Sequence, residues 1–482
     1  MVSLFSQVRE NKVEDPEDKR IAAVVLAAGK GTRMRSSLPK VLHALLGRPL
    51  VLYALEAARE ASQAKPVLVL GSGAEQIQQI VGDAAEIVLQ EPQLGTGHAV
   101  AQAAHTLKGR VDHVLVTPAD MPLLRGETLR KVVQAHLSDN AKALSGLGGD
   151  AAAVITLLTV RSNRARGFGR IRRDQGGRIQ AIVEEAEASP ADLTLEELNA
   201  SVYCFNAAWL WEALPRIRVS TAGEYYLTDL IELAVGDGYT VQTLQIEDES
   251  EAIGINNRIH LAEAESFLRQ RINETWMLAG VTVVDPRYTT IEPGVTIGQD
   301  TVIWPNTYLR GSTTIGEACE VGPNCIITDT RIGRECRIVL SVLEKAVLED
   351  RVHVGPFAHL RAGAHLADGV HMGNFGEIKN SHLGPGTKMG HFSYVGDATI
   401  GAGVNIGAGT ITCNYDGERK HPTEIGDGAF IGSDTLLVAP VRVGEGASTG
   451  AGAVVTRNVP PNTLAVGMPA RAIRKKEKRD QS

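Results

Sequence analysis

The sequence predicts an α/β domain with a mostly parallel, doubly wound, Rossmann-like sheet, then a connecting helix and a left-handed parallel β-helix. Two patterns predict this organisation. From residue 21 to about 250, apolar runs rich in β-branched residues alternate with stretches of helical periodicity, as in a parallel sheet covered by helices. Beyond residue 280, aliphatic residues recur every six positions, as in a hexapeptide-repeat solenoid. The length of 482 residues also favours two or three domains.

The first pattern assigns the elements of the α/β domain. The expected strands are the runs IAAVVLA, KPVLVLG, AEIVLQ, VDHVLVT and AAVITLLTV. The expected helices include PLVLYALEAAREAS and TGHAVAQAAHTL, which combine helical periodicity with good helix formers. Ligands of such sheets bind at the carboxyl ends of the strands, so we expect a site there.

The second pattern sets the register of the β-helix. Each six residues form one flat side of a triangular coil, so residues about 18 apart stack at the ~4.8 Å strand spacing. The stretch TCNYDGERKHPT breaks the repeat and predicts a loop, and loops of solenoids often lie on the binding face. The residues expected to point inward are Ile291, Ile297, Ile303, Leu309, Ile315, Val321, Ile327, Ile332, Ile338, Leu348, Val354, Leu360, Leu366, Met372, Ile378, Leu383, Met389, Val395, Ile400, Ile406, Ile425, Ile431, Leu437, Val443 and Thr449.

These patterns divide the chain into five parts. Between the two domains, Ile259, Leu268 and Ile272 fall near helical spacing and predict the linker helix. The expected parts are an N-terminal extension over 1–20, the α/β domain over 21–258, the linker helix over 259–280, the β-helix over 281–470 and a basic, solvated tail over 471–482.

Composition and charge exclude several classes of protein. The formal net charge of −7 argues against a general nucleic-acid or membrane surface. The charged N-terminal stretch is expected to be neither a signal peptide nor a membrane span, and no later apolar run has the length of a transmembrane helix. Five scattered cysteines without a C-x-x-C pair predict reduced thiols in a cytoplasmic protein.

A glycine-rich loop follows the first predicted strand, in AAVVLAAGKGTRMRSSLPK, residues 22–40. It fits neither the P-loop template nor the dinucleotide fingerprint. A small-residue loop that leaves a buried strand still lets backbone N–H groups approach a phosphate, and Lys30, Arg33 and Lys40 add positive charge. The alternative is an ordinary glycine-rich turn with solvated basic residues.

These residues carry a resemblance. LAAGKGTRM followed by LPK resembles the signature of sugar-1-phosphate nucleotidyltransferases, and the likeness continues through QLGTGHA, GFGRI, IVEEA, GEYYLTD and GINNR. Together with the hexapeptide half, residues 21 to about 470 resemble one bacterial family, the bifunctional N-acetylglucosamine-1-phosphate uridylyltransferases and glucosamine-1-phosphate N-acetyltransferases.

The resemblance implies two reactions in one chain. Acetyl-CoA acetylates glucosamine-1-phosphate, and UTP then uridylylates the product to UDP-N-acetylglucosamine with release of pyrophosphate. It also implies Mg²⁺, a homotrimer with acetyl sites between subunits, and a supply of precursors for peptidoglycan and lipopolysaccharide. Two alternatives stay open: a monofunctional sugar-1-phosphate nucleotidyltransferase with a structural β-helix, and a non-catalytic nucleotide-sugar sensor.

The resemblance also implies a uridylyl-transfer site. Asp120 and Asn256 match the metal positions, although Pro118-Ala119-Asp120 has alanine where the family usually has glycine. Taken alone, Asp120 could equally be a turn residue, and Glu184 one of a solvated acidic run. The residues that match nucleotide and sugar contacts are Leu26, Ala27, Ala28, Gly29, Lys30, Gly31, Arg33, Lys40, Gln90, Gly95, Thr96, Gly169, Glu184, Asn199 and Asn256.

A second site is implied in the β-helix. His391, in KMGHFSYVGD, matches the acetyltransferase base, since a histidine accepts a proton near neutral pH. Taken alone it is as readily a surface histidine. Arg361, Lys379, Tyr394 and Asn405 match contacts to glucosamine-1-phosphate, and Ala408, Asn414, Tyr415, Ser433 and Ala451 match acetyl-CoA positions. Near the C-terminus the likeness weakens, because Met468 replaces an arginine of the family; the candidates to substitute for it are Arg471 and Arg474.

Four histidines, His353, His359, His365 and His371, lie six residues apart. Histidine is a common metal ligand, and the γ-class carbonic anhydrases hold zinc with histidines on this fold. Successive hexapeptides lie on different sides of the prism, however, so only His353 and His371 are expected to stack. Alternation along a strand turns all four outward, which favours solvated or subunit-contact histidines over metal ligands.

Overall fold

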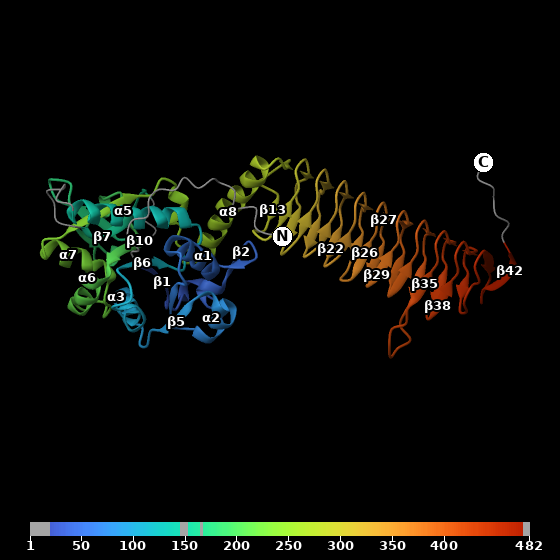
Figure 1. The fold of residues 1–482 in the computed structure, drawn as a ribbon, viewed down its shortest axis with the longest axis horizontal. Helices are drawn as coiled ribbons and strands as arrows, with labels where there is room; N and C mark the ends of the chain where they lie inside the picture. The colour runs from blue at the N-terminus through green and yellow to red at the C-terminus, as the bar shows by residue number, and fades with distance from the viewer. Residues whose placement is uncertain (1–19, 145–152, 164–166, 476–482) are drawn as a thin grey trace. The chain divides into compact units, whose positions relative to one another are not determined.

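The computed structural model describes residues 20–144, 153–163 and 167–475 (Figure 1). Residues 1–19 of the predicted extension and 476–482 of the predicted tail lie outside the described residues. The chain divides into two compact units, Met1–Glu265 and Ser266–Ser482. Among the described helices, none is long and apolar enough to cross a membrane.

The first unit is built on one sheet with a parallel centre. Strands β1 (Ile21–Ala27), β4 (Val67–Leu70), β5 (Glu86–Leu89) and β6 (His113–Pro118) are parallel, in the order β5-β4-β1-β6. The sheet continues through β10 (Glu197–Asn206), β7 (Ala153–Arg161) and β11 (Thr240–Gln245). Strand β10 is antiparallel to β6, to β7 and to β8 (Arg170–Arg173), which in turn pairs antiparallel with β9 (Ile179–Val183). The mostly parallel sheet is therefore confirmed, with antiparallel pairing around β10 and between β8 and β9.

Alternate residues of β1 bury against helices on opposite faces of this sheet. Ala23 and Val25 belong to one core cluster, with helices α1 (Leu50–Ser62) and α5 (Gly126–Leu144). Ala22 and Val24 belong to a second cluster, with α3 (Thr96–Gln102), α6 (Ala207–Ala213) and α7 (Leu230–Gly236). Helices α2 (Ala74–Val81) and α4 (Ala104–Leu107) complete the set. Cores on both faces are what a doubly wound sheet requires.

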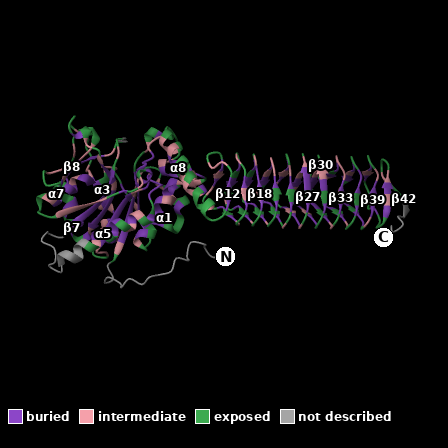
Figure 2. Cartoon of the chain, turned by 90° about the horizontal axis from the view of Figure 1, so that it is seen from above, coloured by how far each residue is buried: buried purple, intermediate pink, exposed green. Residues whose placement is uncertain are grey.

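The second unit is a parallel β-helix. Its described strands form three stacks, which begin at β12 (Thr282–Val283), β13 (Thr290–Ile291) and β14 (Thr296–Ile297). Adjacent coils align Ile291 with Leu309 and Ile315 with Ile332, a step of 17 or 18 residues. Every residue predicted to point inward is buried, and together these residues form most of one continuous core (Figure 2).

Each six-residue side also buries a second, smaller residue that the aliphatic period does not mark. Thr301, Thr313, Cys319 and Ser341 are examples, and all are at most 2% exposed. Their polar atoms are satisfied by the backbone: the Thr301 hydroxyl donates to the Gly316 carbonyl at 2.9 Å. In these examples the second residue is small and its polar atom bonds to the backbone, whereas the buried Thr307 and Thr423 hydroxyls have no partner among the described residues.

Helix α8 (Arg258–Leu278) lies where the sequence predicts the linker, and the division into two units falls within it. Its buried Asn273 donates to the carbonyls of Pro286 and Thr289, at 2.8 and 3.0 Å. These bonds tie the end of the helix to the first coil. At the other end of the β-helix, β42 (Arg471–Lys475) pairs antiparallel with β41 (Thr463–Val466).

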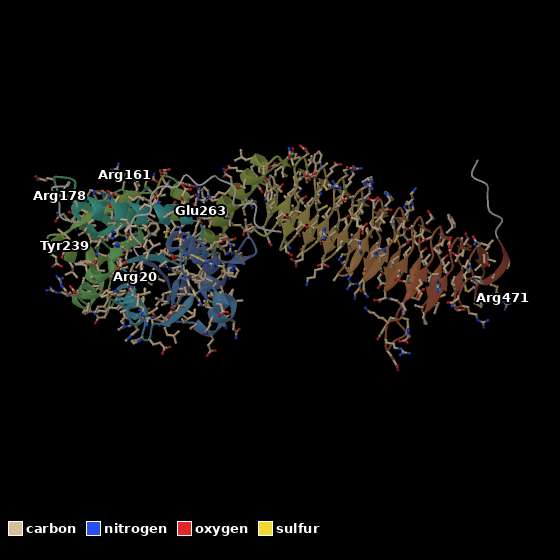
Figure 3. The ribbon with its side chains drawn as sticks, in the orientation of Figure 1. Arg20, Arg161, Arg178, Tyr239, Glu263 and Arg471 are labelled. Carbon is tan, nitrogen blue, oxygen red and sulfur yellow. The ribbon has the colours of Figure 1, made fainter. Side chains whose placement is uncertain are left out.

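The pairing of β42 differs from the solvated tail predicted from residue 471 onward. A stack of parallel strands leaves an edge of unpaired N–H and C=O groups at its last coil, and an added antiparallel strand covers part of that edge. Arg471 itself is exposed, and its side chain is labelled at this end of the unit in Figure 3.

Candidate active sites

The glycine loop begins directly after β1. Gly31 has φ +61°, and a Cβ built there would lie 2.6 Å from Lys40 Cβ. The missing side chain therefore lets the two ends of the loop approach each other. In the short 3-10 turn that follows, Thr32–Met34, Met34 is buried and Arg33 is exposed, as is Lys30 before the turn.

Four predicted residues converge at this loop. Lys40 Nζ lies 2.5 Å from Asp120 Oδ2 and 3.3 Å from Asn256 Oδ1. Arg33 donates to the same Asn256 oxygen at 3.0 Å. The backbone supports the meeting, because the Ile255 N–H donates to the Asp120 carbonyl at 2.8 Å. The structure thus brings the end of β6 and the GINNR segment to the carboxyl end of β1.

The oxygens of this cluster fit magnesium. Asp120 and Asn256 present one carboxylate and one amide oxygen to the same positive atom, Lys40 Nζ. Mg²⁺ prefers oxygen ligands, keeps several waters and is often bound through one or two carboxylates plus substrate phosphates. Within residues 20–144, 153–163 and 167–475, no group of three or more His, Cys, Asp and Glu side chains is placed to hold a metal ion.

Ala119, the departure from the family pattern, is fully buried behind the cluster. Its N–H donates to the Leu26 carbonyl at 3.0 Å, which continues the β1–β6 pairing beyond the strands. Its methyl group packs in the core shared with α1 and α5. The extra methyl is accommodated, and the Asp120 carboxylate still reaches Lys40 and the loop.

The residues predicted to read uracil lie where two motifs pack together. Gln90 is 2% exposed, and its Nε2 donates to the Gly95 carbonyl at 2.9 Å. A Cβ on Gly95 would lie 2.7 Å from the Tyr225 carbonyl, so the close approach requires glycine. Thr96 accepts a bond from the Leu227 N–H at 2.9 Å. QLGTGHA and GEYYLTD are therefore joined by backbone contacts.

The predicted sugar contacts also meet. The Asn199 N–H donates to the Gly169 carbonyl at 2.9 Å, and the Asn199 amide donates to the Tyr203 hydroxyl at 2.6 Å. A Cβ on Gly169 would lie 3.7 Å from Glu184 Oε2. Glu184 is thus close to Gly169 and is not simply part of a solvated acidic run.

Two residues of GEYYLTD that were not among the predicted site residues contribute here. The Thr228 hydroxyl donates to Glu184 Oε1 at 2.9 Å and fixes that carboxylate. Burial raises the pKa of Glu184, and the Thr228 bond partly offsets the shift. Burial, reinforced by Glu232, Glu187 and Glu184, raises the pKa of Asp229 to about 6. Thr228 and Glu184 are 44 residues apart and meet only because the chain folds back. Their spacing in the sequence therefore could not predict this contact.

In the β-helix, His391 ends strand β30 (Lys388–His391) beside β27 (His371–Asn374). Its Nδ1 lies 3.0 Å from Oδ1 of Asn374, a residue that the sequence analysis missed. The signal was available, because Asn374 precedes His391 by 17 residues, one turn of the coil. The His391 side chain is exposed to solvent.

The predicted base and three predicted acetyl-CoA residues share one register position. Each lies two residues beyond an inward residue of the same stack, directly after a glycine. Backbone hydrogen bonds join adjacent coils beside these residues. The Asp434 N–H donates to the Ala408 carbonyl at 2.6 Å, and the Gly452 N–H donates to the Ser433 carbonyl at 2.8 Å. The column consists of Asn374, His391, Ala408, Ser433 and Ala451.

Two cations predicted to bind phosphate lie one coil apart. Arg361 and Lys379 directly follow the paired inward residues Leu360 and Ile378 of β25 (His359–Leu360) and β28 (Glu377–Lys379). Arg361 Nη1 donates to Glu377 Oε1 at 2.8 Å. The Lys420 ammonium, and then Arg361, lowers the pKa of Lys379. This clustering of like charges, to which Lys420 was not predicted to belong, suits a phosphate dianion.

The predicted loop projects between β34 (Ile411–Cys413) and β35 (Thr423–Ile425), as Figure 1 shows. Asn414, at its start, donates to Asp397 Oδ2 at 2.5 Å. A Cβ on Gly396 would lie 2.7 Å from the Asn414 amide nitrogen and would collide with the Tyr394 hydroxyl. Tyr394 and Asn414 therefore meet over Gly396. Tyr415 is 61% exposed, and Asn405 lies on β33 (Asn405–Ile406), next to β30.

The histidine ladder lies on the outer surface. His353 and His371 lie opposite each other on adjacent coils, as expected, with their rings edge to face and the ring centroids 6.0 Å apart. His365 lies opposite His382 in the same edge-to-face way, at 4.7 Å, and its Nε2 lies 2.9 Å from Glu349 Oε1. His359 Nε2 lies 3.1 Å from a carboxylate, that of Glu344. At the C-terminal end, Met468 is 78% exposed, and Arg471 is exposed as well.

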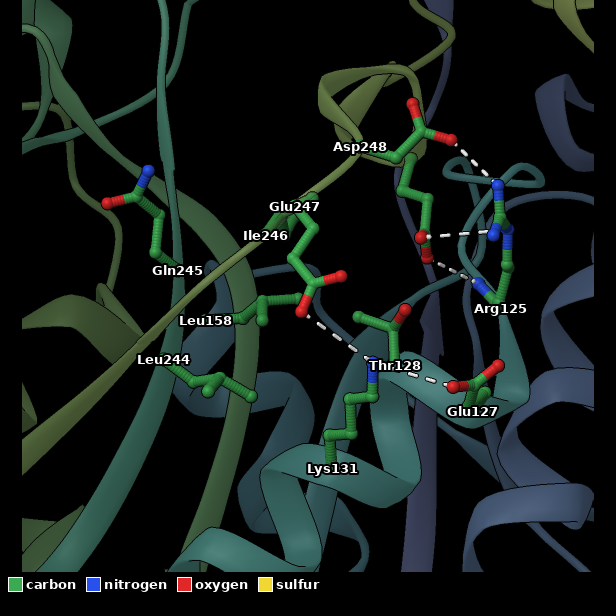
Figure 4. Close-up of a pocket in the computed structure, with 11 residues that line it drawn as sticks. Arg125, Glu127, Thr128, Lys131, Leu158, Leu244, Gln245, Ile246, Glu247 and Asp248 are labelled. Carbon is green, nitrogen blue, oxygen red and sulfur yellow. Dashed lines mark hydrogen bonds and ion pairs between the residues drawn. The ribbon is translucent and has the colours of Figure 1, made fainter.

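A separate pocket of about 150 Å³ lies between α5, β7 and β11 (Figure 4). Its charges are paired with one another: Arg125 lies 2.7 Å from Asp248, and Lys131 lies 3.4 Å from Glu127. It contains none of the predicted site residues. The pocket is therefore distinct from the Lys40–Asp120 cluster.

Comparisons with known proteins agree with both halves. Residues 23–188 match the MobA-like NTP transferase domain, and residues 422–457 match the bacterial transferase hexapeptide (six repeats). The protein called bifunctional protein GlmU in Desulfitobacterium hafniense (strain DSM 10664 / DCB-2) is 47% identical over 446 residues, which cover 92% of this chain and 95% of that protein. Its namesake in Pelobacter propionicus is 46% identical over 452 residues, 93% of this chain and 96% of its own.

A third relative of the same name, from Heliobacterium modesticaldum, is 47% identical over 445 residues, 92% of this chain and 94% of its own. Each of these matches runs through both units and through both clusters described above. The chain therefore belongs to the bifunctional GlmU family, the family that its nucleotidyltransferase and hexapeptide motifs resemble.

Proposed function

We propose that this enzyme makes UDP-N-acetylglucosamine at two separate sites. The β-helix transfers an acetyl group from acetyl-CoA to glucosamine-1-phosphate, and the α/β unit transfers a uridylyl group from UTP to N-acetylglucosamine-1-phosphate. The observation that carries the assignment is the presence of two polar clusters, one in each unit: Lys40 with Asp120 and Asn256, and His391 with Asn374. A β-helix with only a structural role would not need the polar cluster of His391 and Asn374. Its presence therefore disfavours the monofunctional alternative.

Uridylyl transfer is an in-line attack of the sugar phosphate on the α-phosphorus of UTP, and pyrophosphate leaves. Such a step needs alignment and charge neutralisation more than covalent help. Lys30 and Arg33 hold the triphosphate beside the loop. Asp120 and Asn256 would hold Mg²⁺, which would further neutralise the phosphates. Gln90, Gly95 and Thr96 contact uracil. Gly169, Glu184 and Asn199 hold the acetylated sugar.

Acetyl transfer needs the amino group of the sugar to be neutral and aimed at the thioester carbonyl. The nitrogen forms a bond to the carbonyl carbon, His391 accepts the proton that the nitrogen loses, and the C–S bond breaks to release coenzyme A. Arg361 and Lys379 bind the sugar phosphate, with Tyr394 and Asn405 on the sugar. Ala408, Asn414, Tyr415, Ser433 and Ala451 contact acetyl-CoA.

We also infer that the β-helix assembles as a homotrimer, that the enzyme works in the cytoplasm, and that its product feeds peptidoglycan and lipopolysaccharide precursors. The family membership supports these three inferences. The relatives and the two domain matches favour the bifunctional enzyme over a sensor that has lost its chemistry.

The deciding experiment measures thiol release from acetyl-CoA with glucosamine-1-phosphate, for wild type and for His391→Ala. We expect release by the wild type and a loss of at least about 100-fold in the variant, the size of a typical general-base contribution. Pyrophosphate release from UTP and N-acetylglucosamine-1-phosphate should be the same in both. No thiol release by a wild type that still forms pyrophosphate would favour the monofunctional alternative.

A further inference from the structure

The acetyl-transfer site contains a polar side chain without an assigned role. Asn374 closes β27 and stands opposite His391 in the β27–β30 register. The distance from its Oδ1 to His391 Nδ1 is 3.0 Å. The Asn374 side chain is half-buried, whereas that of His391 is exposed. The contact therefore fixes the inner side of the imidazole and leaves its other side toward solvent.

The chemistry of this contact selects one tautomer. A carbonyl oxygen only accepts hydrogen bonds, so His391 Nδ1 must carry a proton and donate to Asn374 Oδ1. In a neutral imidazole, a proton on Nδ1 leaves the lone pair on Nε2. We propose that Asn374 is a positioning residue that holds His391 in the tautomer whose Nε2 accepts the substrate proton, an inference that rests on the proposed acetyltransferase function.

The backbone around the pair is held as closely as the ring. A Cβ on Gly373 would collide with the Gly390 carbonyl, so two glycines let the strands approach directly before Asn374 and His391. The buried Ser393 hydroxyl donates to the His391 carbonyl at 2.9 Å and lies 3.2 Å from the Gly407 carbonyl. His391 is therefore fixed through its main chain as well as through Nδ1.

A neutral partner suits a base better than a charged one. A carboxylate at this position would also accept from Nδ1–H, but it would favour the imidazolium, which cannot accept a proton. The nearest titratable groups on the two strands are His371 and Lys388, which stand opposite each other three residues earlier. Neither adds negative charge beside the ring, and the amide orients it through a neutral oxygen.

The proton path in this arrangement balances. As the sugar nitrogen bonds to the acetyl carbon, its proton passes to Nε2, and the imidazolium keeps its Nδ1–H on Asn374. When the C–S bond breaks, the electron pair leaves with sulfur, and Nε2 returns the proton to the thiolate. The Asn374 contact is maintained in both protonation states of His391, so it guides the ring throughout.

The test compares thiol release by wild type, Asn374→Ala and Asn374→Asp, with Thr399→Ala as the control. Thr399 is an exposed strand residue on β32 (Ala398–Ile400), in another stack of the same unit. We expect Asn374→Ala to lower kcat about 10- to 100-fold with the KM for both substrates within about twofold, as for other residues that orient a histidine. Asn374→Asp should restore most of kcat, with the acid limb of the pH profile moved to higher pH.

Two control measurements separate the explanations. Pyrophosphate release and the unfolding midpoint of each variant should match Thr399→Ala, so that loss of folding is not the cause. A wild-type rate in Asn374→Ala, or an Asn374→Asp variant as poor as Asn374→Ala with no shift of its pH profile, would overturn the positioning role. Absence of thiol release in the wild type would instead overturn the acetyltransferase function, and the inference with it.

Discussion

Lys40 Nζ lies 2.5 Å from Asp120 Oδ2, so a loop residue and a strand-end residue 80 positions apart form one ion pair. The two side chains are 15% and 23% exposed, which places the pair partly out of water. Asn256 joins it from a third segment, at 3.3 Å from Lys40 Nζ. Because water screens partly buried charges less, these charges interact more strongly with a triphosphate than fully exposed charges would.

The first prediction concerns the charge of Asp120. Asp120→Asn keeps the shape of the side chain and removes its charge, so both the proposed metal ligand and the partner of Lys40 are weakened. We expect uridylyl transfer, measured by pyrophosphate release, to fall by at least about 100-fold. Thiol release in the other unit should stay within about twofold. The control Asp112→Asn breaks an exposed pair with Arg20, and a similar loss there would contradict the assignment.

The second prediction concerns the shape of the loop. In Gly31→Ala the new Cβ would lie 2.6 Å from Lys40 Cβ, at a φ of +61° that costs about 1 kcal/mol for alanine. Lys40 must then move away from Asp120, and we expect the KM for UTP to rise about tenfold, a loss of about 1.4 kcal/mol. Gly109→Ala is the matched control, with φ +75° and nothing within 4 Å of the new Cβ. Equal effects of the two substitutions would show that backbone strain alone is responsible.

The third prediction concerns pH. The pKa of Asp229 is raised to about 6 by burial and by neighbouring carboxylates, so the folded state holds this proton more tightly than the unfolded state. Its contribution to stability therefore falls as pH rises from about 4 through 6, and the loss is complete above that range. Asp229→Asn removes this dependence. We expect its unfolding midpoint, relative to wild type, to be higher at pH 8 than at pH 4.

A variant whose relative stability should change with pH in the opposite direction serves as the control. Arg216 lowers the pKa of Asp237, whose stabilising contribution is present above its unfolded value and is lost in acid. Asp237→Asn should therefore be less stable than wild type at pH 8, and this difference should shrink toward pH 3. A relative midpoint of Asp229→Asn that does not change with pH would contradict the third prediction.

The period of six located the inward residues of the β-helix because burial on one flat side leaves no choice of register. It did not mark the second buried residue of each side, such as Thr301 or Ser341, because threonine, serine, cysteine, alanine and valine all occupy that position and give no uniform pattern. The β-branched runs located the parallel strands in the same way. Strand β10 was missed, because its polar Asn199 and Ser201 interrupt the apolar run.

The sequence predicted which residues belong to the sites better than it predicted which of their atoms are in contact. Resemblance named Lys40, Asp120 and Asn256, but which oxygen meets which cation depends on chain segments more than 200 positions apart. The hydrogen bond from the Thr228 hydroxyl to Glu184 is a similar case. Asn374 differs, because it lies one coil before His391, here a step of 17 residues. In a solenoid, partners across a coil can be read from the sequence once the register is known.

The last prediction tests how far this register controls stability. Leu360 is fully buried and stacks between Leu343 and Ile378. Leu360→Ala leaves a cavity that adjacent coils cannot fill, and we expect a loss of about 2–5 kcal/mol in the free energy of unfolding of the β-helix. Because each coil of a solenoid contacts only its neighbours, the weakening should centre on Arg361 and Glu377. Thiol release should then be lost at a lower temperature than in wild type, whereas pyrophosphate release keeps its own midpoint.

The control is Val347→Ala, at an outward and partly exposed position, which should change the free energy of unfolding by less than about 0.5 kcal/mol. If both activities of Leu360→Ala were lost at one lowered temperature, the two units would unfold together, and the local account of the β-helix would be wrong.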